Sequence, residues 1–288
     1  MHAMKKMLWP TAILSATLGF AARAQELEVI GKPVNGKIGL QPAATDVAIA
    51  TQALDGLVHV IIIAIALLVL LLTLWLVVRY NRVANKTPRR FTHNTPLEIA
   101  WTLIPVLILV FIGANSLPVL FKQQEIPAGD VVIKVTGNQW YWSYEYVDHE
   151  FGFDSFLLAR DELADYGYTD DLYLLATDTA LVVPTGKKIV MQVTGADVIH
   201  SWTIPAFGVK QDAVPGRLAE LWFTVEPGKE GIYFGQCSEL CGKDHAFMPI
   251  TVKAMSEADY NAWLTGAVDE YSGNPATLPD IVELALAE

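Results

Sequence analysis

The chain is poor in cysteine and in basic residues. Its 288 residues include two cysteines, and 20 lysines and arginines stand against 31 acidic residues, which gives a formal net charge of −11. Two cysteines can form only one disulfide, which excludes a fold held together by several. The shortage of positive charge argues against nucleic acid as a partner and favours a basic protein.

Charge is absent altogether from two long stretches. Segments 56–78 and 99–121 contain no charged residue, and hydrophobic residues make up 52% of the chain. As a helix, each stretch would measure about 35 Å, which is long enough to cross the hydrocarbon core of a bilayer and to contact membrane lipid. We therefore predict two transmembrane helices within residues 55–121. Their connecting loop, 79–96, is rich in basic residues and should be cytoplasmic.

The first 24 residues lack acidic residues and have the pattern of a secretory signal. Lys5 and Lys6 precede an apolar segment, and Ala22-Arg23-Ala24 offers a small-residue cleavage site. We predict a signal peptide over 1–24, followed by an irregular exported arm over 25–54. The alternative is a membrane anchor that stays attached, for which the apolar segment is short. Two crossings would then leave everything after residue 122 in the periplasm.

Beyond residue 122, long apolar runs give way to short ones. Segments 131–136, 181–183, 188–194, 221–225 and 232–234 are rich in β-branched and aromatic residues, and Pro and Gly separate them. This pattern predicts an all-β sandwich or Greek-key barrel over 122–270. We expect 151–171 to be an inserted loop and 256–267 to be a closing helix capped by Ser256. The tail, 271–288, has no clear pattern.

Both cysteines lie in the run Cys237-Ser-Glu-Leu-Cys241-Gly-Lys-Asp-His245-Ala-Phe-Met248. Thiolate, imidazole and thioether groups bind soft metals, and a thioether ligand favours copper. A β fold could bring His200 alongside. Two sulfurs can bridge two copper ions, and sharing one electron over both ions limits the structural change on reduction. The run therefore predicts a two-copper electron-transfer centre.

Three other interpretations compete for the same residues. Cys237 and Cys241 could form a disulfide in an exported protein, although that leaves His245 and Met248 unexplained. Zinc could occupy a Cys₂His₂ site, which has no use for a methionine. Met248 could simply fill the core, as most buried methionines do.

Four segments carry a resemblance to a known family. The run 235–249 resembles the binuclear copper loop of cytochrome c oxidase subunit II, and segments 139–146, 197–205 and 210–217 resemble other parts of that family. The resemblance covers about residues 30–265. It implies a two-helix transmembrane hairpin followed by a cupredoxin-like Greek-key barrel. It also implies the inner membrane of a bacterium, with the copper domain in the periplasm.

The resemblance further implies a set of metal ligands. Those for two copper ions are His200, Cys237, Cys241, His245 and Met248, with the main-chain carbonyl of Glu239. The carboxylate of Glu239 matches a ligand to a magnesium ion shared with subunit I. One carboxylate is too few for magnesium, so water and the partner subunit would supply the other ligands.

Residues outside the loop also match functional positions of the family. Trp140 matches the point at which electrons arrive from cytochrome c, and Glu98 matches a residue at the start of a proton-uptake path. From sequence alone, Glu98 is a helix-start carboxylate favoured by the helix dipole. The carboxylates that match cytochrome c docking positions are Glu145, Asp154, Asp178 and Asp197.

Together these matches imply the copper-bearing subunit of a bacterial, proton-pumping oxidase. Electrons would pass from cytochrome c through copper to haem in subunit I, where oxygen is reduced to water; subunit III is a further expected partner. The related copper domain of nitrous oxide reductase lacks membrane spans, and a quinol oxidase subunit would lack the copper ligands. A membrane-anchored β domain that serves structure or copper delivery is the third alternative.

Overall fold

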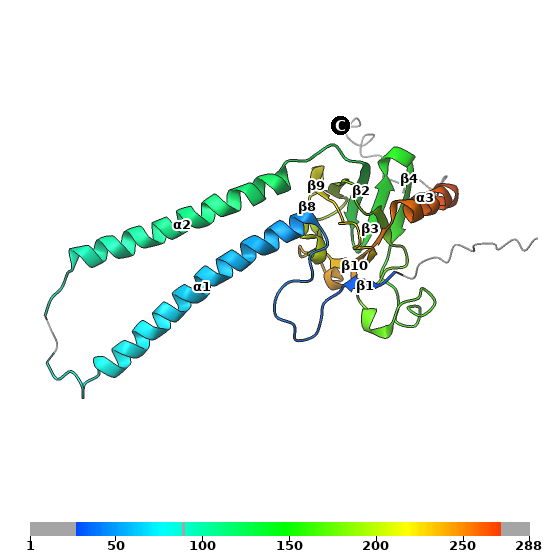
Figure 1. The fold of residues 1–288 in the computed structure, drawn as a ribbon. Helices are drawn as coiled ribbons and strands as arrows, with labels where there is room; N and C mark the ends of the chain where they lie inside the picture. The colour runs from blue at the N-terminus through cyan, green and yellow to red at the C-terminus, as the bar shows by residue number, and fades with distance from the viewer. Residues whose placement is uncertain (1–26, 88–89, 272–288) are drawn as a thin grey trace, which may run out of the picture.

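Two long helices lead into an all-β domain in the computed structural model, which describes residues 27–87 and 90–271 (Figure 1). Helix α1 spans Asp46–Arg79 and helix α2 spans Thr95–Gln124. Both are long and apolar enough to cross a membrane, and the side chains of their apolar segments are largely exposed. The helices run side by side as a hairpin that projects from one end of the β domain. This arrangement confirms the two predicted helices.

Helix α1 begins at Asp46, well ahead of the apolar stretch that starts at residue 56. Thr45 caps it: the hydroxyl accepts a hydrogen bond from the Ala48 amide (3.0 Å) and donates one to the Phe207 carbonyl (2.6 Å). Val47 and Ala48 are buried against the β domain. The last part of the arm expected to be irregular is therefore helical, because its first turn completes the core of the domain.

The β domain consists of two larger sheets and a two-stranded ribbon. Their strand orders are β1-β10-β11-β5, β4-β3-β2-β6-β9 and β7-β8. The strands are β1 Val29–Gly31, β2 Val131–Asn138, β3 Tyr141–Tyr146, β4 Phe151–Ser155, β5 Leu181–Pro184, β6 Ile189–Gly195, β7 His200–Ile204, β8 Val209–Ala213, β9 Ala219–Phe223, β10 Gly231–Gln236 and β11 Pro249–Met255. Side chains from both larger sheets share one core. The prediction of an all-β, cupredoxin-like domain is confirmed, and the domain consists of sheets packed on a shared core.

The aromatic strand β3 shows how the sequence places side chains in this core. Trp142, Tyr144 and Tyr146 alternate along the strand and are at most 1% exposed. Side chains two residues apart share one face of a strand, so this alternation follows directly from the sequence. Trp140 departs from the pattern, because it lies in the turn before β3 and is only partly buried.

The inserted segment was expected over 151–171, and that prediction is wrong at its start. Residues Phe151–Ser155 form β4, which pairs with β3, because their alternating aromatic residues extend the buried face. The insertion is instead a lobe over 156–177. Its apolar side chains Leu158, Leu163 and Leu172 form a second small core with Phe234 of β10.

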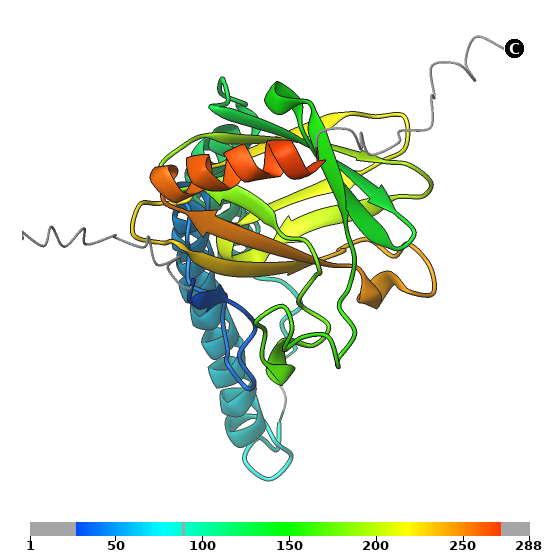
Figure 2. The same cartoon turned by 90° about the vertical axis from the view of Figure 1, so that its right-hand side faces the viewer.

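A helix closes the domain, as predicted, and runs further than expected. Helix α3 spans Glu257–Tyr271 and lies across the strands (Figure 2). The hydroxyl of Ser256 accepts a hydrogen bond from the Asp259 amide (3.2 Å), as a helix cap does. The predicted signal peptide 1–24 lies outside the described residues, as does the tail beyond Tyr271.

Candidate metal centre

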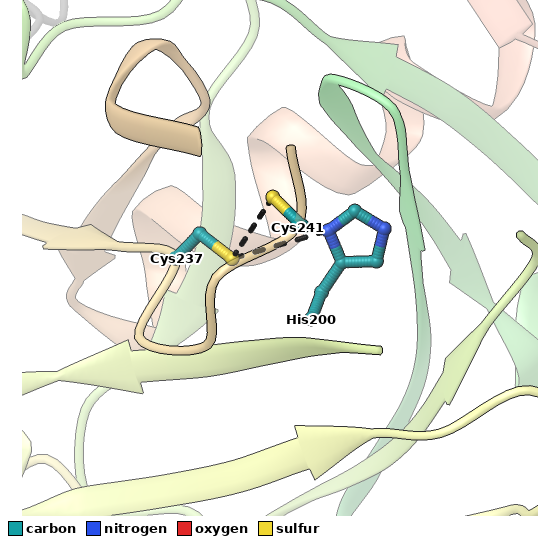
Figure 3. Close-up of side chains that lie close together, drawn as sticks. All are labelled: His200, Cys237 and Cys241. Carbon is teal, nitrogen blue, oxygen red and sulfur yellow. Dashed lines mark hydrogen bonds between the residues drawn. The ribbon is translucent and has the colours of Figure 1, made fainter. Parts of the chain in front are cut away.

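Three predicted ligands meet at one end of the β domain. His200 opens strand β7, and the two cysteines lie in the loop that follows β10. The Sγ atoms of Cys237 and Cys241 are 3.8 Å apart, and His200 Nδ1 lies 3.9 Å from Cys237 Sγ (Figure 3). All three side chains are buried, and their donor atoms lie within 4.8 Å of one another.

The other predicted ligands adjoin this group. His245 Nδ1 lies 3.5 Å from Cys241 Sγ, and the thioether sulfur of Met248 lies 3.4 Å from the same atom. The main-chain carbonyl of Glu239 is 3.3 Å from Cys237 Sγ. Thus the other three predicted side chains and the predicted carbonyl all lie close to the two cysteine sulfur atoms.

The set of donor atoms fits a copper site better than a disulfide or a zinc site. Both cysteines are free, and their sulfurs are far beyond the disulfide bond length of about 2.05 Å. A zinc site of four ligands would leave the thioether of Met248 without a role, whereas thioethers are typical weak ligands of copper. Two thiolates, two imidazoles, one thioether and one carbonyl are enough donors for two copper ions.

Two glycines allow the strands to approach closely enough to form this group. A Cβ atom on Gly137 of β2 would lie 2.9 Å from the ring of His200. A Cβ atom on Gly235 of β10 would lie 1.9 Å from the carbonyl oxygen of Thr203 in β7. Glycine at both positions therefore lets His200 reach the cysteine loop.

Asp197 fixes the orientation of the His200 ring. Its Oδ1 lies 2.9 Å from His200 Nε2, which leaves Nδ1 facing the sulfur of Cys237. The same carboxylate accepts hydrogen bonds from the Gln139 and Val198 amides. Carboxylates that orient a metal-binding histidine are typical of protein metal sites. The sequence suggested Asp197 only for docking; its position three residues before His200 was the available signal.

The pKa values of the Cys237 and Cys241 thiols are shifted in opposite directions. Burial raises the pKa of Cys237, but hydrogen bonds from His200 and from main-chain amides outweigh it and hold that pKa below its usual value. Burial, together with the negative charge of Cys237, raises the pKa of Cys241. For His200, burial lowers the pKa, while hydrogen bonds to Cys237 and Asp197 raise it above its usual value overall. Metal binding requires both thiols to lose their protons.

Trp140 rests directly on the cysteine loop. Its indole N–H donates a hydrogen bond to the Cys241 carbonyl (3.2 Å), and the side-chain amide of Gln139 donates to the same oxygen (2.8 Å). A Cβ atom on Gly242, where φ is +126°, would lie 2.9 Å from Cζ2 of Trp140. The sequence did not indicate Gln139 or Gly242, because both act only through this contact between loop and turn.

Three of the four predicted docking carboxylates gather around Tyr141, the neighbour of Trp140. Burial, followed by the charges of Asp154 and Asp197, raises the pKa of Tyr141. The Tyr141 ring stacks on Phe156 (4.5 Å between ring centroids), whose amide donates a hydrogen bond to Asp178 (2.8 Å).

The fourth docking carboxylate, Glu145, lies further along β3. It pairs with Lys134 of β2 (3.3 Å), which offsets part of its charge.

The two remaining predicted residues lie outside this group: Glu98 is half-buried and Glu239 is exposed. Glu98 accepts a hydrogen bond from the Asn94 amide (3.2 Å) in the first turn of α2, which is a capping contact. Glu239 lies at the tip of the cysteine loop. The described part of the chain holds one group of three or more Cys, His, Asp or Glu side chains that could bind a metal, and Glu239 is not in it. A magnesium ion at Glu239 would therefore need ligands from elsewhere.

Comparison with known proteins covers most of the chain. Residues 33–119 match the family model for the cytochrome c oxidase subunit II transmembrane domain, and residues 131–255 match the model for its periplasmic domain. Cytochrome c oxidase subunit 2 of Cereibacter sphaeroides is 58% identical over 269 residues, which cover 88% of each chain. The Arabidopsis thaliana subunit is 39% identical over 248 residues, covering 82% of this chain and 92% of that protein.

A solved structure of the periplasmic domain of cytochrome oxidase subunit II from Bradyrhizobium japonicum is also similar. It is 49% identical and covers 51% of this chain and 99% of that one, with a TM-score of 0.45. The family models together span both the helical hairpin and the β domain, and the curated relatives align over most of the chain. The chain therefore belongs to the cytochrome c oxidase subunit II family.

Proposed function

We propose that this chain receives electrons from cytochrome c at a binuclear copper centre and passes them to haem in subunit I of the oxidase. The single observation that carries the proposal is the convergence of two free thiols, two imidazoles and one thioether in one group, in which every side chain but that of His245 is buried. Copper bound there would supply a one-electron store that changes its redox state with little rearrangement of its ligands.

The protein holds the donor atoms ready for the metal. Strand β7 and the loop after β10 hold His200, Cys237 and Cys241 close together. Burial keeps water away from the sulfurs, and Asp197 keeps the His200 ring from rotating. Preorganisation of this kind lowers the cost of reorganisation when charge changes at the site.

Cytochrome c would dock on the carboxylates beside Trp140. Asp154, Asp178 and Asp197 form an acidic surface around Tyr141 that would attract a basic protein. Electrons would then cross from Trp140 to the copper centre through the hydrogen bond between the indole and the Cys241 carbonyl. The acidic surface speeds encounter, and the indole provides the short path.

The remaining assignments follow the orientation of the chain. We place the copper domain in the periplasm of a bacterium, on the outer side of the inner membrane, after a cleaved signal peptide over 1–24. Glu98, at the opposite end of α2 from the β domain, would stand where protons are taken up from the cytoplasm. Glu239 would contribute one carboxylate to a magnesium ion at the joint with subunit I. Subunit III completes the expected assembly.

Electron spin resonance of the purified oxidase tests the central claim. The whole chain is required, because β1 and the first turn of α1 are part of the β domain. When an unpaired electron is shared by two copper nuclei, its resonance signal splits into more hyperfine lines than one nucleus can produce. A signal from a single copper nucleus, or a Cys237–Cys241 disulfide in the metal-loaded protein, would refute the binuclear centre.

A further inference from the structure

An exposed apolar loop joins strand β1 to helix α1. Residues 33–40 are all exposed, and the exposed fractions of Val34, Ile38 and Leu40 are 58%, 98% and 53%. The amide of Lys37 donates a hydrogen bond to the Val34 carbonyl (3.1 Å), so the segment turns sharply. Three large apolar side chains on one exposed turn are unusual unless something covers them.

Contacts with α1 set the height of this loop relative to the membrane. The side-chain amide of Gln52 donates a hydrogen bond to the Gln41 carbonyl at the end of the loop (2.8 Å). Gln52 precedes the uncharged stretch of α1, which starts at residue 56, by a single helical turn of about 6 Å. The loop thus lies close to the level at which α1 becomes apolar.

Helix α2 independently indicates the same position for the membrane boundary. Its uncharged stretch ends at Phe121, and the next residue, Lys122, pairs with Asp46 at the start of α1 (2.9 Å). The hydrocarbon boundary therefore falls between the level of Asp46 and that of residue 56 on α1. Gln52, with the loop attached to it, lies inside this interval.

The direction of the loop agrees with that level. From β1 the chain leaves the β domain, runs beside the first turns of α1 and returns to the domain at Ala44, whose amide donates a hydrogen bond to the Ala206 carbonyl (2.9 Å). The loop lies beside α1 in both views of the fold (Figures 1 and 2). Its tip is thus turned from the β domain toward the membrane-spanning part.

The charge of the loop suits a phospholipid surface. In an acidic protein, the segment between Glu28 and Asp46 carries Lys32 and Lys37 and no acidic residue. Lys32 pairs with Asp171 of the inserted lobe, whereas Lys37 makes no ion pair within the described residues. A lysine among exposed apolar side chains is typical of segments that lie in the headgroup region of an anionic bilayer.

We propose that residues 33–40 dip into the outer surface of the lipid bilayer, with Val34, Ile38 and Leu40 among the upper acyl chains and Lys37 at the phosphates. The loop then forms a third membrane contact beside the two helices. Because its ends are fixed by β1 and by Ala44, this contact holds the β domain at a set height and tilt above the lipid.

Photolabelling of the whole oxidase tests the proposal. The oxidase is placed in nanodiscs of phosphatidylcholine and phosphatidylglycerol that contain phosphatidylcholine with a diazirine near the top of one acyl chain. After illumination and digestion, mass spectrometry maps the lipid adducts. We expect adducts within residues 33–41 as well as within both helices, and none on Phe156 or Tyr166, which are exposed on the inserted lobe.

Two outcomes would overturn the proposal. Labelled helices with an unlabelled loop would show that lipid does not reach these residues. A cross-link from Lys37 to a carboxylate of another oxidase subunit would show that protein covers the loop instead. The wild-type protein suffices for both measurements. In a supporting variant, Ile38→Ser with Leu40→Ser, adducts on the loop should be lost while those on the helices persist.

Discussion

Among single residues, Asp197 links the candidate metal centre to the proposed docking surface. Without copper, Asp197 pairs with His200. Burial raises the pKa of Asp197, but hydrogen bonds from His200 and from main-chain amides lower it overall. Burial lowers the pKa of His200, but its contacts with Cys237 and then with Asp197 raise it overall. The lowered pKa contributes stability above the usual aspartate value of about 4, and the raised pKa contributes stability below the usual histidine value of about 6.5. The pair therefore stabilises the copper-free fold most between these two values and less as pH rises past the pKa of His200.

Asp197→Asn should lower the melting temperature of the copper-free protein more at pH 5.5 than at pH 8. Asparagine still accepts hydrogen bonds but cannot carry the charge that the pair requires. Thermal unfolding in detergent at the two pH values measures the difference. An equal loss at both values would mean that the charge of Asp197 does not stabilise the fold.

Gly242 lies directly against the indole of Trp140. Gly242→Ala should lower the free energy of unfolding by about 1–3 kcal/mol, because φ at this site is +126° and the new Cβ would meet the indole. It should also slow electron transfer from cytochrome c to copper, measured by flash photolysis. Gly228→Ala is the matched control, since Gly228 also has a positive φ (+83°) but has nothing within 4 Å of its Cβ position. Equal rates in the two variants would contradict the role of Gly242.

At the scale of elements, the position of Glu98 at the start of helix α2 fits two roles, a capping contact and proton uptake. Its carboxylate accepts a hydrogen bond from the Asn94 amide, while Asn94 in turn accepts one from the Leu97 amide (3.2 Å). A capping contact at a helix start accounts for about 0.3–1 kcal/mol through the dipole. A proton-uptake role requires, in addition, that the side chain can gain and lose a proton.

Two substitutions separate these explanations. Glu98→Gln keeps an oxygen that accepts the Asn94 hydrogen bond but cannot carry a proton, whereas Glu98→Ala removes both. We expect both variants to slow oxygen consumption and to leave the copper spectrum unchanged. Normal turnover in Glu98→Gln with slow turnover in Glu98→Ala would leave capping as the only role.

The elements differ in how far the sequence predicts them. Both membrane helices follow from charge-free stretches, and β3 follows from alternating aromatic residues. Strands β7 and β8 carry no such pattern, because Ser201, Lys210 and Asp212 interrupt their apolar residues. These strands form through pairing with each other, which is a contact that local propensity does not encode. The helical first turn of α1 was missed because its burial depends on Phe207, far away in the chain.

The same limit applies to the candidate centre. Spacing in one short run predicts Cys237, Cys241, His245 and Met248, and the structure brings them together. The fit of His200 depends on two glycines in other strands, Gly137 and Gly235, whose importance appears only when the strands are packed. The sequence thus predicts ligands that lie close together in one run, whereas the room for His200 between the strands depends on tertiary packing.

Over the whole molecule, the acidic surface around Tyr141 should govern the encounter with cytochrome c. Asp154→Asn should slow electron transfer at low ionic strength, since Asp154 is exposed and accepts only the Ser143 hydroxyl in the described structure, a bond that asparagine can keep (2.6 Å). The difference from wild type should shrink in about 1 M salt, where charges are screened beyond about 3 Å.

A matched substitution shows whether position or net charge matters. Asp130→Asn removes the same charge at the opposite end of β2 from Trp140 and should change the rate far less. Stopped-flow kinetics over a range of ionic strength gives both slopes. If the two variants had the same slope, net charge rather than a docking surface would control association.

The parallel pairing of β1 with β10 bears on the order in which the protein is made. Val29 pairs with Ile232, and Ala44 and Val47 enter the same core as Tyr233. The arm is synthesised before both helices, yet its partner strand is among the last parts of the domain to leave the ribosome. Pairing over so long a separation is slow to form. With the β domain on the outer side of the membrane, as proposed, the arm must wait, already tethered to the bilayer by α1, until nearly the whole chain has crossed. The domain would then close only at the end of biogenesis.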